Sequence, residues 1–499
     1  MRNKIQYILL ITLIITTISQ AQKIKVPIDT TVVTSHTTII KGKKIPYQAT
    51  TGFQPVWNEN REPIASLFYT YYKRSDIKNN ENRPLLISFN GGPGSASVWM
   101  HIAYTGPQIL KIDEEGFPIQ PYGIKSNPNS VLDVADIVFV NPVNTGYSRM
   151  IEDKEGKLPD KKIFFGVNED IKYLAAWINT FVTRNNRWRS PKYLIGESYG
   201  TTRVSGLALE LQNNQWMYLN GVILVSPTEI GFKFDGPVEV ANRLPYFTAA
   251  AWYHKMLPPE LQNKDLLEVL PEAENYTINE LLPALVKGGY LENSKKEEVI
   301  TKMAYYSGLS KKTIRQNNLE VPKSYFWKDL LREKEGLTIG RLDSRYKGMD
   351  IKESGNNPDY NSELTAWLHA FTPAINYYIN QKLNFKTDLK YNMFGPVRPW
   401  DRTKGNHTGE NLREAMAMNA NLHTMIQSGY YDGATTYFNA KYIMWQLNAN
   451  SKLTDRLSFN GYRSGHMMYL RNEDLIQANE DIRSFIIKSS SNITKGSKY

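Results

Sequence analysis

The stretch that most constrains the fold is a glycine-bracketed serine at residues 196–200, which read Gly-Glu-Ser-Tyr-Gly. A short apolar run, Tyr193 to Ile195, precedes it, and residues 201–211 follow with apolar side chains at helical spacing. A strand, a Gly-x-Ser-x-Gly turn and a helix in that order form the context of a nucleophile elbow. A side chain at either glycine would crowd so tight a turn, so the sequence predicts a strained Ser198 at a strand tip. Because such a motif arises by chance in about one chain in five of this size, an ordinary strand-to-helix turn is the alternative.

A second glycine-rich loop, Gly91-Gly-Pro-Gly94, follows an apolar run at residues 83–90 that predicts a strand. Three glycines in four residues let the backbone approach a ligand closely and turn its N–H groups outward, as an oxyanion hole requires. In folds with a nucleophile elbow, a loop after an upstream strand supplies one of the two oxyanion donors. We therefore expect this loop to serve Ser198. The alternative is a loop that only reverses the chain.

Strands and helices alternate along the first half of the chain. Runs of β-branched and aromatic residues between positions 31 and 72 predict a β meander, interrupted by the turn-rich residues 58–63. Further strands are predicted at 83–90, 131–140, 193–195 and 219–226, and helices at 163–182 and 201–211. This alternation is typical of a doubly wound, mostly parallel sheet with helices on both faces. The predicted fold class is α/β, and with the elbow it is the α/β-hydrolase fold.

The pattern changes after residue 227. Residues 228–418 are mainly helical in pattern, with helices predicted at 237–254, 259–270, 278–286 and 360–384. An insertion at the carboxyl end of a sheet strand would cover the active site as a cap. The predicted organisation is a signal peptide at 1–21, the hydrolase core at 22–227 and 419–499, and a helical cap insertion at 228–418. The polar stretch Gly340 to Gly348 in the cap receives no role beyond that of a charged loop.

A serine nucleophile needs a base, and the base needs an acid that orients it. The order expected in this fold is serine, acid, histidine. Asp432 follows the strand predicted at 422–427, and His466 lies in a glycine-bracketed loop after the last predicted strand. Both are therefore candidate partners of Ser198. Asp455 is a rival acid, but it precedes a strand; an aspartate that opens a turn and a structural histidine are the remaining interpretations.

The first residues predict export. Arg2 and Lys4 form a charged start, residues 8–18 are mostly apolar, and small residues at 19–21 fit a cleavage site before Gln22. The apolar run is too short for a membrane span, so no stable membrane insertion is expected after cleavage near Ala21. We expect a bacterial protein in the periplasm or the extracellular space. The chain has no cysteine, so no disulfide supports its fold.

The charge of the chain says little about its partners. The formal net charge is +11, which would suit anionic envelope polymers, but the basic residues are scattered and favour an ordinary solvated surface. The small lysine clusters at 42–44 and 295–296 lack interleaved aromatic residues, so no nucleic acid partner is expected.

Five motifs together resemble the serine carboxypeptidase family, and they occur in the family's order. They are Phe89-Asn-Gly-Gly-Pro-Gly94, the segment Pro142 to Ser148, Gly196-Glu-Ser-Tyr-Gly200, Gly429-Tyr-Tyr-Asp432 and Gly465-His-Met467. The similarity covers about residues 50–490 and is weakest in the cap. It is specific because five separate motifs agree.

The resemblance implies a role for each matched residue. Ser198, Asp432 and His466 correspond to a catalytic triad, and the N–H groups of Gly92 and Tyr199 to an oxyanion hole. The groups implied to bind the terminal carboxylate of a substrate are Asn90, the Gly91 N–H and Glu197.

The sequence departs from the family's pattern at three positions. Ser88 stands where the family has a tryptophan, in the wall of the carboxylate pocket. Asn144 replaces a glycine, and Tyr430 replaces the first aspartate of the acid motif. The family's disulfides are absent.

The sequence therefore predicts a secreted serine carboxypeptidase that hydrolyses C-terminal residues from peptides through an acyl-enzyme. The expected partners are peptides with a free C-terminal carboxylate, and no metal or cofactor is implied. One alternative is an esterase or acyltransferase that uses the same triad. A second alternative is an inactive, envelope-binding homologue.

Overall fold

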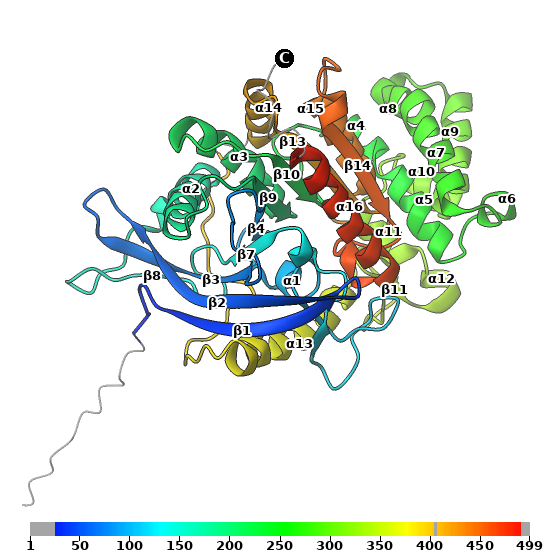
Figure 1. Cartoon of the computed structure of the whole chain (residues 1–499). Coiled ribbons are helices and arrows are strands. Elements are labelled where there is room, and N and C mark those ends of the chain that lie inside the picture. The colour runs from blue at the N-terminus through cyan, green and yellow to red at the C-terminus, as the bar shows by residue number, and fades with distance from the viewer. Residues whose placement is uncertain (1–24, 404–406, 491–499) are drawn as a thin grey trace, which may run out of the picture.

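A twisted sheet of ten strands runs through the centre of the computed structural model, which describes residues 25–403 and 407–490 (Figure 1). The spatial order of the strands is β1-β2-β3-β7-β4-β9-β10-β13-β14, with the short β8 paired to β3. The bounds are β1 Thr31–Ile40, β2 Lys43–Trp57, β3 Pro63–Arg74, β4 Leu85–Phe89, β7 Asp136–Val140, β8 Arg149–Met150, β9 Lys192–Glu197, β10 Gly221–Val225, β13 His423–Gly429 and β14 Leu457–Tyr462.

The sheet is parallel where the candidate site residues lie. Strands β7, β4, β9, β10, β13 and β14 pair in parallel, whereas β1, β2 and β3 form an antiparallel meander that joins β7. The predicted doubly wound, mostly parallel sheet and its N-terminal meander are confirmed. Because the carboxyl ends of parallel strands meet at one edge, the loops after β4, β9, β13 and β14 share that edge.

Alternation along the strands divides their side chains between two cores. Leu86 of β4 and Ile195 of β9 belong to one buried cluster, whereas Leu85 and Leu194 of the same strands belong to the other. A strand buried on both faces reads as a continuous apolar run, which is the pattern that the sequence shows here.

Helices cover both faces of the sheet, as Figure 1 shows. Side chains of α1, α13 and α16 join the first cluster, and those of α2, α3, α14 and α15 join the second. The bounds are α1 Val98–His101, α2 Val167–Arg184, α3 Tyr199–Asn214, α13 Ser362–Tyr377, α14 Thr408–Met418, α15 Tyr437–Leu447 and α16 Asn472–Ser490.

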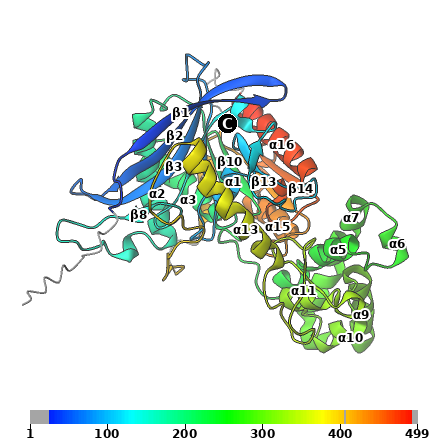
Figure 2. The same cartoon turned by 90° about the horizontal axis from the view of Figure 1, so that it is seen from below.

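The chain between β10 and β13 carries a group of helices with a core of its own. Buried residues from Ala241 to Ile339 form a separate apolar cluster, and Figure 2 shows these helices to one side of the sheet, with α13 running from them across the sheet. The elements are α4 Pro237–Ala241, α5 Leu244–Tyr253, α6 Pro259–Gln262, α7 Leu266–Tyr276, α8 Leu282–Lys287, α9 Asn293–Ser307, α10 Lys311–Gln316, α11 Lys323–Asp329, α12 Arg332–Glu335, β11 Thr338–Ile339 and β12 Lys347–Gly348. Within the stretch proposed as a cap at 228–418, α13 and α14 thus pack with the sheet.

Two predicted elements begin later than expected. The strand predicted at 131–140 is wrong in its first part, because Val131–Asp133 form a single 3₁₀ turn whose start is capped by the Ser130 side chain. The helix predicted at 163–182 starts four residues late, because Gly166 is extended and serves as its N-cap. In the first case a local capping hydrogen bond overrides the apolar pattern, and in the second the extended backbone of Gly166 ends it.

Two of the helices predicted in the insertion are broken into shorter pieces. The helix predicted at 237–254 is two helices, α4 and α5, with Pro245 in the first turn of α5. The helix predicted at 259–270 is likewise interrupted, because the Asp265 side chain accepts a hydrogen bond from the Leu267 N–H and starts α7 there.

The predicted signal peptide at 1–21 lies outside the described residues. None of the helices in the described ranges is long and apolar enough to cross a membrane.

Candidate active site

The predicted elbow lies between β9 and α3. Ser198 has φ 57° and ψ −126°, a strained backbone for a residue other than glycine. A Cβ at Gly196 would lie 2.2 Å from the Gly200 carbonyl oxygen, and a Cβ at Gly200 would lie 2.8 Å from the Phe89 carbonyl oxygen. Both glycines are therefore required by close contacts, and they place the serine at the carboxyl edge of the sheet.

Asp432 and His466 form a buried pair at the same edge. His466 Nδ1 lies 2.6 Å from Asp432 Oδ2, and neither side chain is more than 7% exposed. Asp432 also accepts hydrogen bonds from the backbone N–H groups of Ala434 and Thr435 and from the Thr435 hydroxyl. The carboxylate is thus held in one orientation, with one oxygen on the histidine.

This environment favours a basic imidazole. Burial alone would lower the pKa of His466, but the negative charges of Asp432 and Glu197 outweigh it and raise that pKa above its usual 6.5. A histidine with its Nδ1 proton on a carboxylate presents Nε2 as the base, as nucleophilic catalysis by serine requires.

Ser226 joins the loops around the three candidate catalytic residues, and the sequence did not reveal it. It follows β10, between the strand that carries Ser198 and the strand that precedes Asp432. Its hydroxyl donates to the His466 carbonyl at 2.7 Å, and its own carbonyl lies 3.0 Å from the Thr435 hydroxyl oxygen, whose proton it shares with Asp432. Its φ of 46° is a second strained value at this edge, which only the structure shows.

The loop after β4 packs directly on the elbow. A Cβ at Gly91 would lie 2.5 Å from the Tyr199 nitrogen, so only glycine lets the two segments come this close. Gly92 has φ 106°, which turns its peptide in a way that residues with a Cβ rarely adopt. Among the described residues, neither the Gly92 nor the Tyr199 N–H donates to another protein group. Both remain available to a ligand, as an oxyanion hole requires.

Asn90 and Glu197 form a buried polar pair beside the serine. Asn90 Nδ2 donates to Glu197 Oε1 at 2.9 Å, and the Tyr469 hydroxyl donates to Glu197 Oε2. Burial raises the pKa of Glu197 to about 7, although the charge of His466 and the two hydrogen bonds act in the opposite direction. A carboxyl with this pKa holds its proton over much of the neutral range and can donate it in a hydrogen bond.

Tyr469 is a functional candidate that the sequence analysis missed. It is fully buried, stacks on Tyr104 with ring centres 4.5 Å apart, and follows His466 by three residues. An aromatic hydroxyl so close to the candidate base was the available signal.

A buried ion pair under the elbow anchors the glycine loop. Arg203 of α3 donates to Asp170 of α2 at 2.6 Å, to the Asn90 carbonyl at 2.7 Å and to the Pro93 carbonyl at 3.3 Å. The guanidinium therefore joins α2, α3 and the loop after β4. In the sequence, Arg203 looked like any polar residue of an amphipathic helix.

The structure also shows where the rival acid Asp455 lies, and where the three residues that depart from the family pattern lie. Asp455 is exposed in the turn before β14, at the opposite end of that strand from His466. Ser88 is fully buried, with its hydroxyl near the Met100 sulfur. Asn144 has φ 66°, a conformation that glycine and asparagine adopt readily. A Cβ at Gly461 would lie only 2.2 Å from the Tyr430 hydroxyl oxygen, so this tyrosine packs closely against the glycine.

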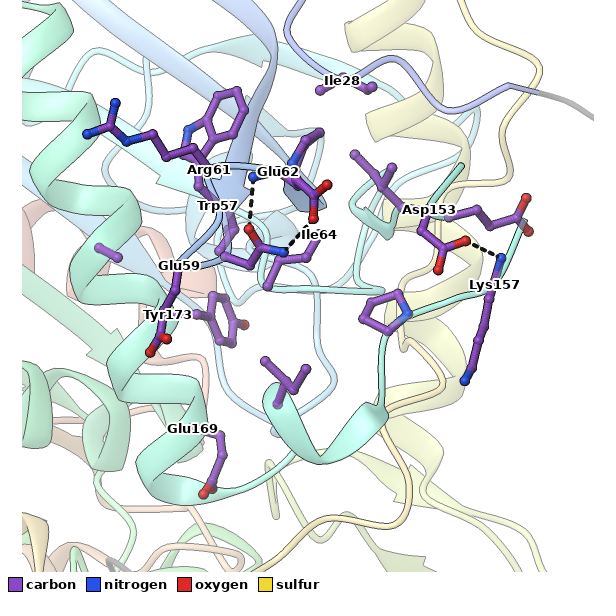
Figure 3. A pocket seen from close by; sticks show the side chains of 18 of the residues that line it. Ile28, Trp57, Glu59, Arg61, Glu62, Ile64, Asp153, Lys157, Glu169 and Tyr173 are labelled. Atoms are coloured by element: carbon purple, nitrogen blue, oxygen red, sulfur yellow. Dashed lines mark hydrogen bonds between the residues drawn. The ribbon is translucent and has the colours of Figure 1, made fainter. Parts of the chain in front are cut away.

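A large hollow lies away from these residues. Its volume is about 1210 Å³, and it lies between the β2–β3 turn, the loop after β8 and the start of α2 (Figure 3). Trp57, Ile64 and Tyr173 line it together with charged residues of both signs, and none of the eight predicted site residues does. In the described ranges, no cluster of three or more histidine, aspartate or glutamate side chains could hold a metal ion.

A parallel sheet with helices on both faces and a strained serine between a strand and a helix defines an α/β-hydrolase fold. The family model described as serine carboxypeptidase matches residues 41–464, and the chain belongs to this family. The family that the motifs predicted is thus confirmed.

Individual relatives match parts of the chain. Serine carboxypeptidase-like 36 of Arabidopsis thaliana is 29% identical over 181 residues, which are 34% of this chain and 35% of that protein. The retinoid-inducible serine carboxypeptidase of Rattus norvegicus is 27% identical over 287 residues, 54% of this chain and 55% of the relative. The chain therefore spans between a third and little more than half of these relatives' length.

A solved structure supports the fold. The Kex1(delta)p structure, described as a prohormone-processing carboxypeptidase from Saccharomyces cerevisiae, matches with a TM-score of 0.51 and 15% identity. The match covers 88% of this chain and 91% of the other.

Proposed function

We propose that this protein is a serine carboxypeptidase that removes residues one at a time from the C-terminus of peptides. The observation that carries the proposal is the combination of a strained Ser198, the Asp432–His466 pair, and the buried Asn90–Glu197 pair in adjacent loops of one sheet edge. Family membership supports the same reaction.

In the proposed reaction, the Ser198 oxygen attacks the last peptide carbonyl while His466 takes the hydroxyl proton. Asp432 orients the imidazole and stabilises its positive form. The N–H groups of Gly92 and Tyr199 stabilise the oxygen that becomes negative. His466 then gives its proton to the departing amino acid as the carbon–nitrogen bond breaks. Water, deprotonated by the same histidine, hydrolyses the acyl-enzyme and restores the serine.

In this proposal, the buried Asn90–Glu197 pair makes the enzyme specific for the C-terminal end of a peptide substrate. A substrate carboxylate beside Glu197 would be repelled by an ionised glutamate, whereas a protonated one donates a hydrogen bond to it. The Asn90 amide and the Gly91 N–H are the other proposed donors. A peptide without a free terminal carboxylate would forgo these bonds, so exopeptidase action is favoured over internal cleavage.

Mass spectrometry of a mixed peptide pool after incubation tests the proposal. Ladders shortened from the C-terminus support it, and internal cuts or trimming from the N-terminus contradict it. A fluorophosphonate probe that fails to label Ser198 in the folded protein would favour an inactive homologue. Product analysis with added alcohols or amines separates hydrolysis from acyl transfer, because only an acyltransferase gives mainly the acceptor adduct.

The predicted organisation and location of the chain belong to the same proposal. Export by a bacterium, with cleavage near Ala21, depends on the first 21 residues. The division into a core at 22–227 and 419–499 and a cap at 228–418 is supported by the separate apolar cluster of the insertion.

A further inference from the structure

The centre of the polar stretch 340–348, here called the cap segment, is buried, although the sequence indicated no more than a charged loop. It joins β11 to β12, and its residues Asp343, Ser344, Arg345 and Tyr346 are each at most 5% exposed. Burying two charged side chains in a loop costs free energy unless they are fully paired. The partners of this segment therefore indicate what it does.

The backbone of the cap segment is hydrogen-bonded to both loops of the proposed catalytic pair. The Leu342 carbonyl accepts from the His466 N–H at 2.6 Å, and the Arg341 carbonyl accepts from the Gly433 N–H at 3.0 Å. The Ser344 N–H donates to the Tyr431 carbonyl at 3.0 Å. The residues before and after Asp432, and His466 itself, are thus bonded to the cap segment.

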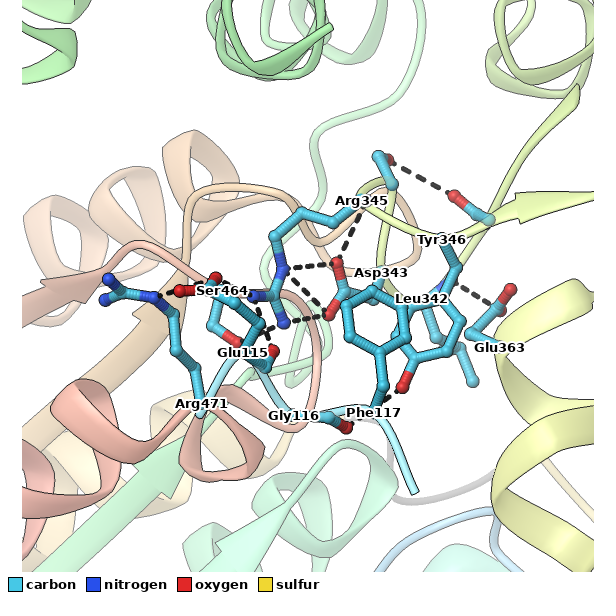
Figure 4. A network of polar contacts seen from close by, with 12 residues as sticks. Glu115, Gly116, Phe117, Leu342, Asp343, Arg345, Tyr346, Glu363, Ser464 and Arg471 are labelled. Carbon is cyan, nitrogen blue, oxygen red and sulfur yellow. Dashed lines mark hydrogen bonds and ion pairs between the residues drawn. The ribbon is translucent and has the colours of Figure 1, made fainter. Parts of the chain in front are cut away.

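Arg345 adds a side-chain link to the histidine loop, as Figure 4 shows. Its guanidinium donates to Asp343 through Nε and Nη2, with 2.7 Å from Nη2 to Oδ2. Nη2 also donates to the Ser464 hydroxyl at 3.0 Å, and Nη1 donates to the Glu115 carbonyl at 2.9 Å. One side chain therefore joins the cap, a core loop and the residue two positions before His466.

The other side of the cap segment is anchored in the insertion and in α13. The Ser344 hydroxyl lies 2.5 Å from the Tyr246 hydroxyl, and the Ser344 carbonyl lies 2.6 Å from His254 Nε2. Glu363 of α13 accepts from the Leu342 N–H at 2.8 Å. The cap segment is therefore hydrogen-bonded to the insertion and α13 on one side and to the histidine and aspartate loops on the other. A change in the position of the insertion would move the histidine loop with it.

We propose that the cap segment positions the catalytic histidine and aspartate, and that Arg345 is a positioning residue that acts on His466 through Ser464. This inference rests on the proposed function, because it concerns the reaction of the same triad. The physical reason is that a serine triad loses rate steeply when the base moves by a fraction of an ångström, even though substrate binding is unaffected.

Ser464→Ala is the informative variant. It removes the acceptor on the histidine loop but leaves the buried Arg345–Asp343 pair intact, whereas Arg345→Ala would leave Asp343 buried without its partner and endanger the fold. We expect kcat to fall about tenfold with KM within about twofold of wild type. The substrate should be an ester without a free carboxylate, so that Glu197 does not contribute.

The pH profile is the readout that a purely structural role would not move. The charged groups that act on His466 are Asp432, Glu197 and Arg341. Asp432 raises the pKa of the histidine, so a looser pair lets that pKa fall, and the acid limb of kcat/KM should move about half a pH unit lower. Hydrogen exchange at the His466 amide, which is bonded to Leu342, should become faster.

Ser130→Ala is the matched control. Ser130 is fully buried, and its hydroxyl donates to the Thr105 carbonyl at 2.7 Å. It precedes β7, so it lies at the amino ends of the parallel strands, away from the candidate site. It should lower the melting temperature without changing kcat or the acid limb. The proposal is overturned if Ser464→Ala behaves like this control, or if kcat falls while the acid limb and the His466 amide exchange stay at their wild-type values.

The exchange measurement separates this inference from the proposed function. If the wild-type protein hydrolyses no peptide or ester, the proposed function fails. Faster exchange at His466 in Ser464→Ala than in Ser130→Ala would still support the link between the cap segment and the histidine loop, and equal exchange would overturn it.

Discussion

Glu197→Gln tests the proposed role of Glu197 in binding the terminal carboxylate of a peptide. In the proposed mechanism, kcat/KM for a peptide needs a neutral His466 and a protonated Glu197, and burial raises the pKa of Glu197 to about 7. Two pH units above that pKa, only about one Glu197 in 100 is protonated, so kcat/KM should fall about 100-fold by roughly pH 9. The acid limb lies above 6.5, because the pKa of His466 is raised, so the peptide profile should be a narrow bell near neutral pH.

Glutamine cannot ionise, and it donates a hydrogen bond at every pH. The variant should therefore keep kcat/KM for peptides level over the range in which the wild type loses about 100-fold. Its acid limb should stay close to that of the wild type, because Glu197 is already protonated and uncharged on the acid side of its pKa of about 7.

The assay is kcat/KM against pH for both proteins, on a peptide and on an ester without a free carboxylate. The ester is the control: its wild-type profile should rise through the acid limb and then stay level. Superimposable wild-type and Glu197→Gln profiles on the peptide would remove Glu197 from the carboxylate site.

Three further changes test other parts of the site. Ser198→Ala should abolish nearly all turnover and leave peptide binding and the melting temperature unchanged. His466→Ala should lower kcat by a similar factor, because triad members act as a unit. Substantial activity in either variant would refute the triad. Tyr469→Phe should move the alkaline limb for peptides up by about one pH unit, because the hydroxyl stabilises the ionised form of Glu197; an unmoved limb in a pH titration of kcat/KM would contradict that role. Arg203→Met should lower the free energy of unfolding by about 3–5 kcal/mol in urea titrations, because Asp170 is left buried without its partner; a loss below about 1 kcal/mol would show that the pair carries little stability.

The elbow and the order of the site loops could be predicted because their signals are local. Gly196 and Gly200 are dictated by contacts within a few residues of the turn or with the adjacent strand, and the apolar runs mark the strands themselves. Once the sheet is parallel, the residues after β9, β13 and β14 must share an edge, which is why Ser198, Asp432 and His466 could be chosen without coordinates. Their chemical roles stay predictions until the variants are measured.

The supporting contacts could not be predicted, because their partners are far apart in the sequence. Tyr469 meets Glu197 across 272 positions, and Arg345 meets Ser464 across 119. No periodicity or turn signal links such residues. The late start of β7 has a local cause instead. The Ser130 hydroxyl accepts a hydrogen bond from the Leu132 N–H and favours a turn there, which a prediction from hydrophobic spacing alone does not take into account.

The absence of a side chain at Gly465 determines how the insertion can behave during turnover. A Cβ there would lie 2.5 Å from both the Asp343 Cβ and the Leu342 carbonyl oxygen, so the backbones of the insertion and the histidine loop touch. If the insertion swung away, the amides of His466 and Gly433 and the carbonyl of Tyr431 would all lose their partners, at a cost of about 1–3 kcal/mol for each that stayed buried. The insertion is therefore firmly bonded to the histidine loop, and we expect its helices to stay in place during turnover.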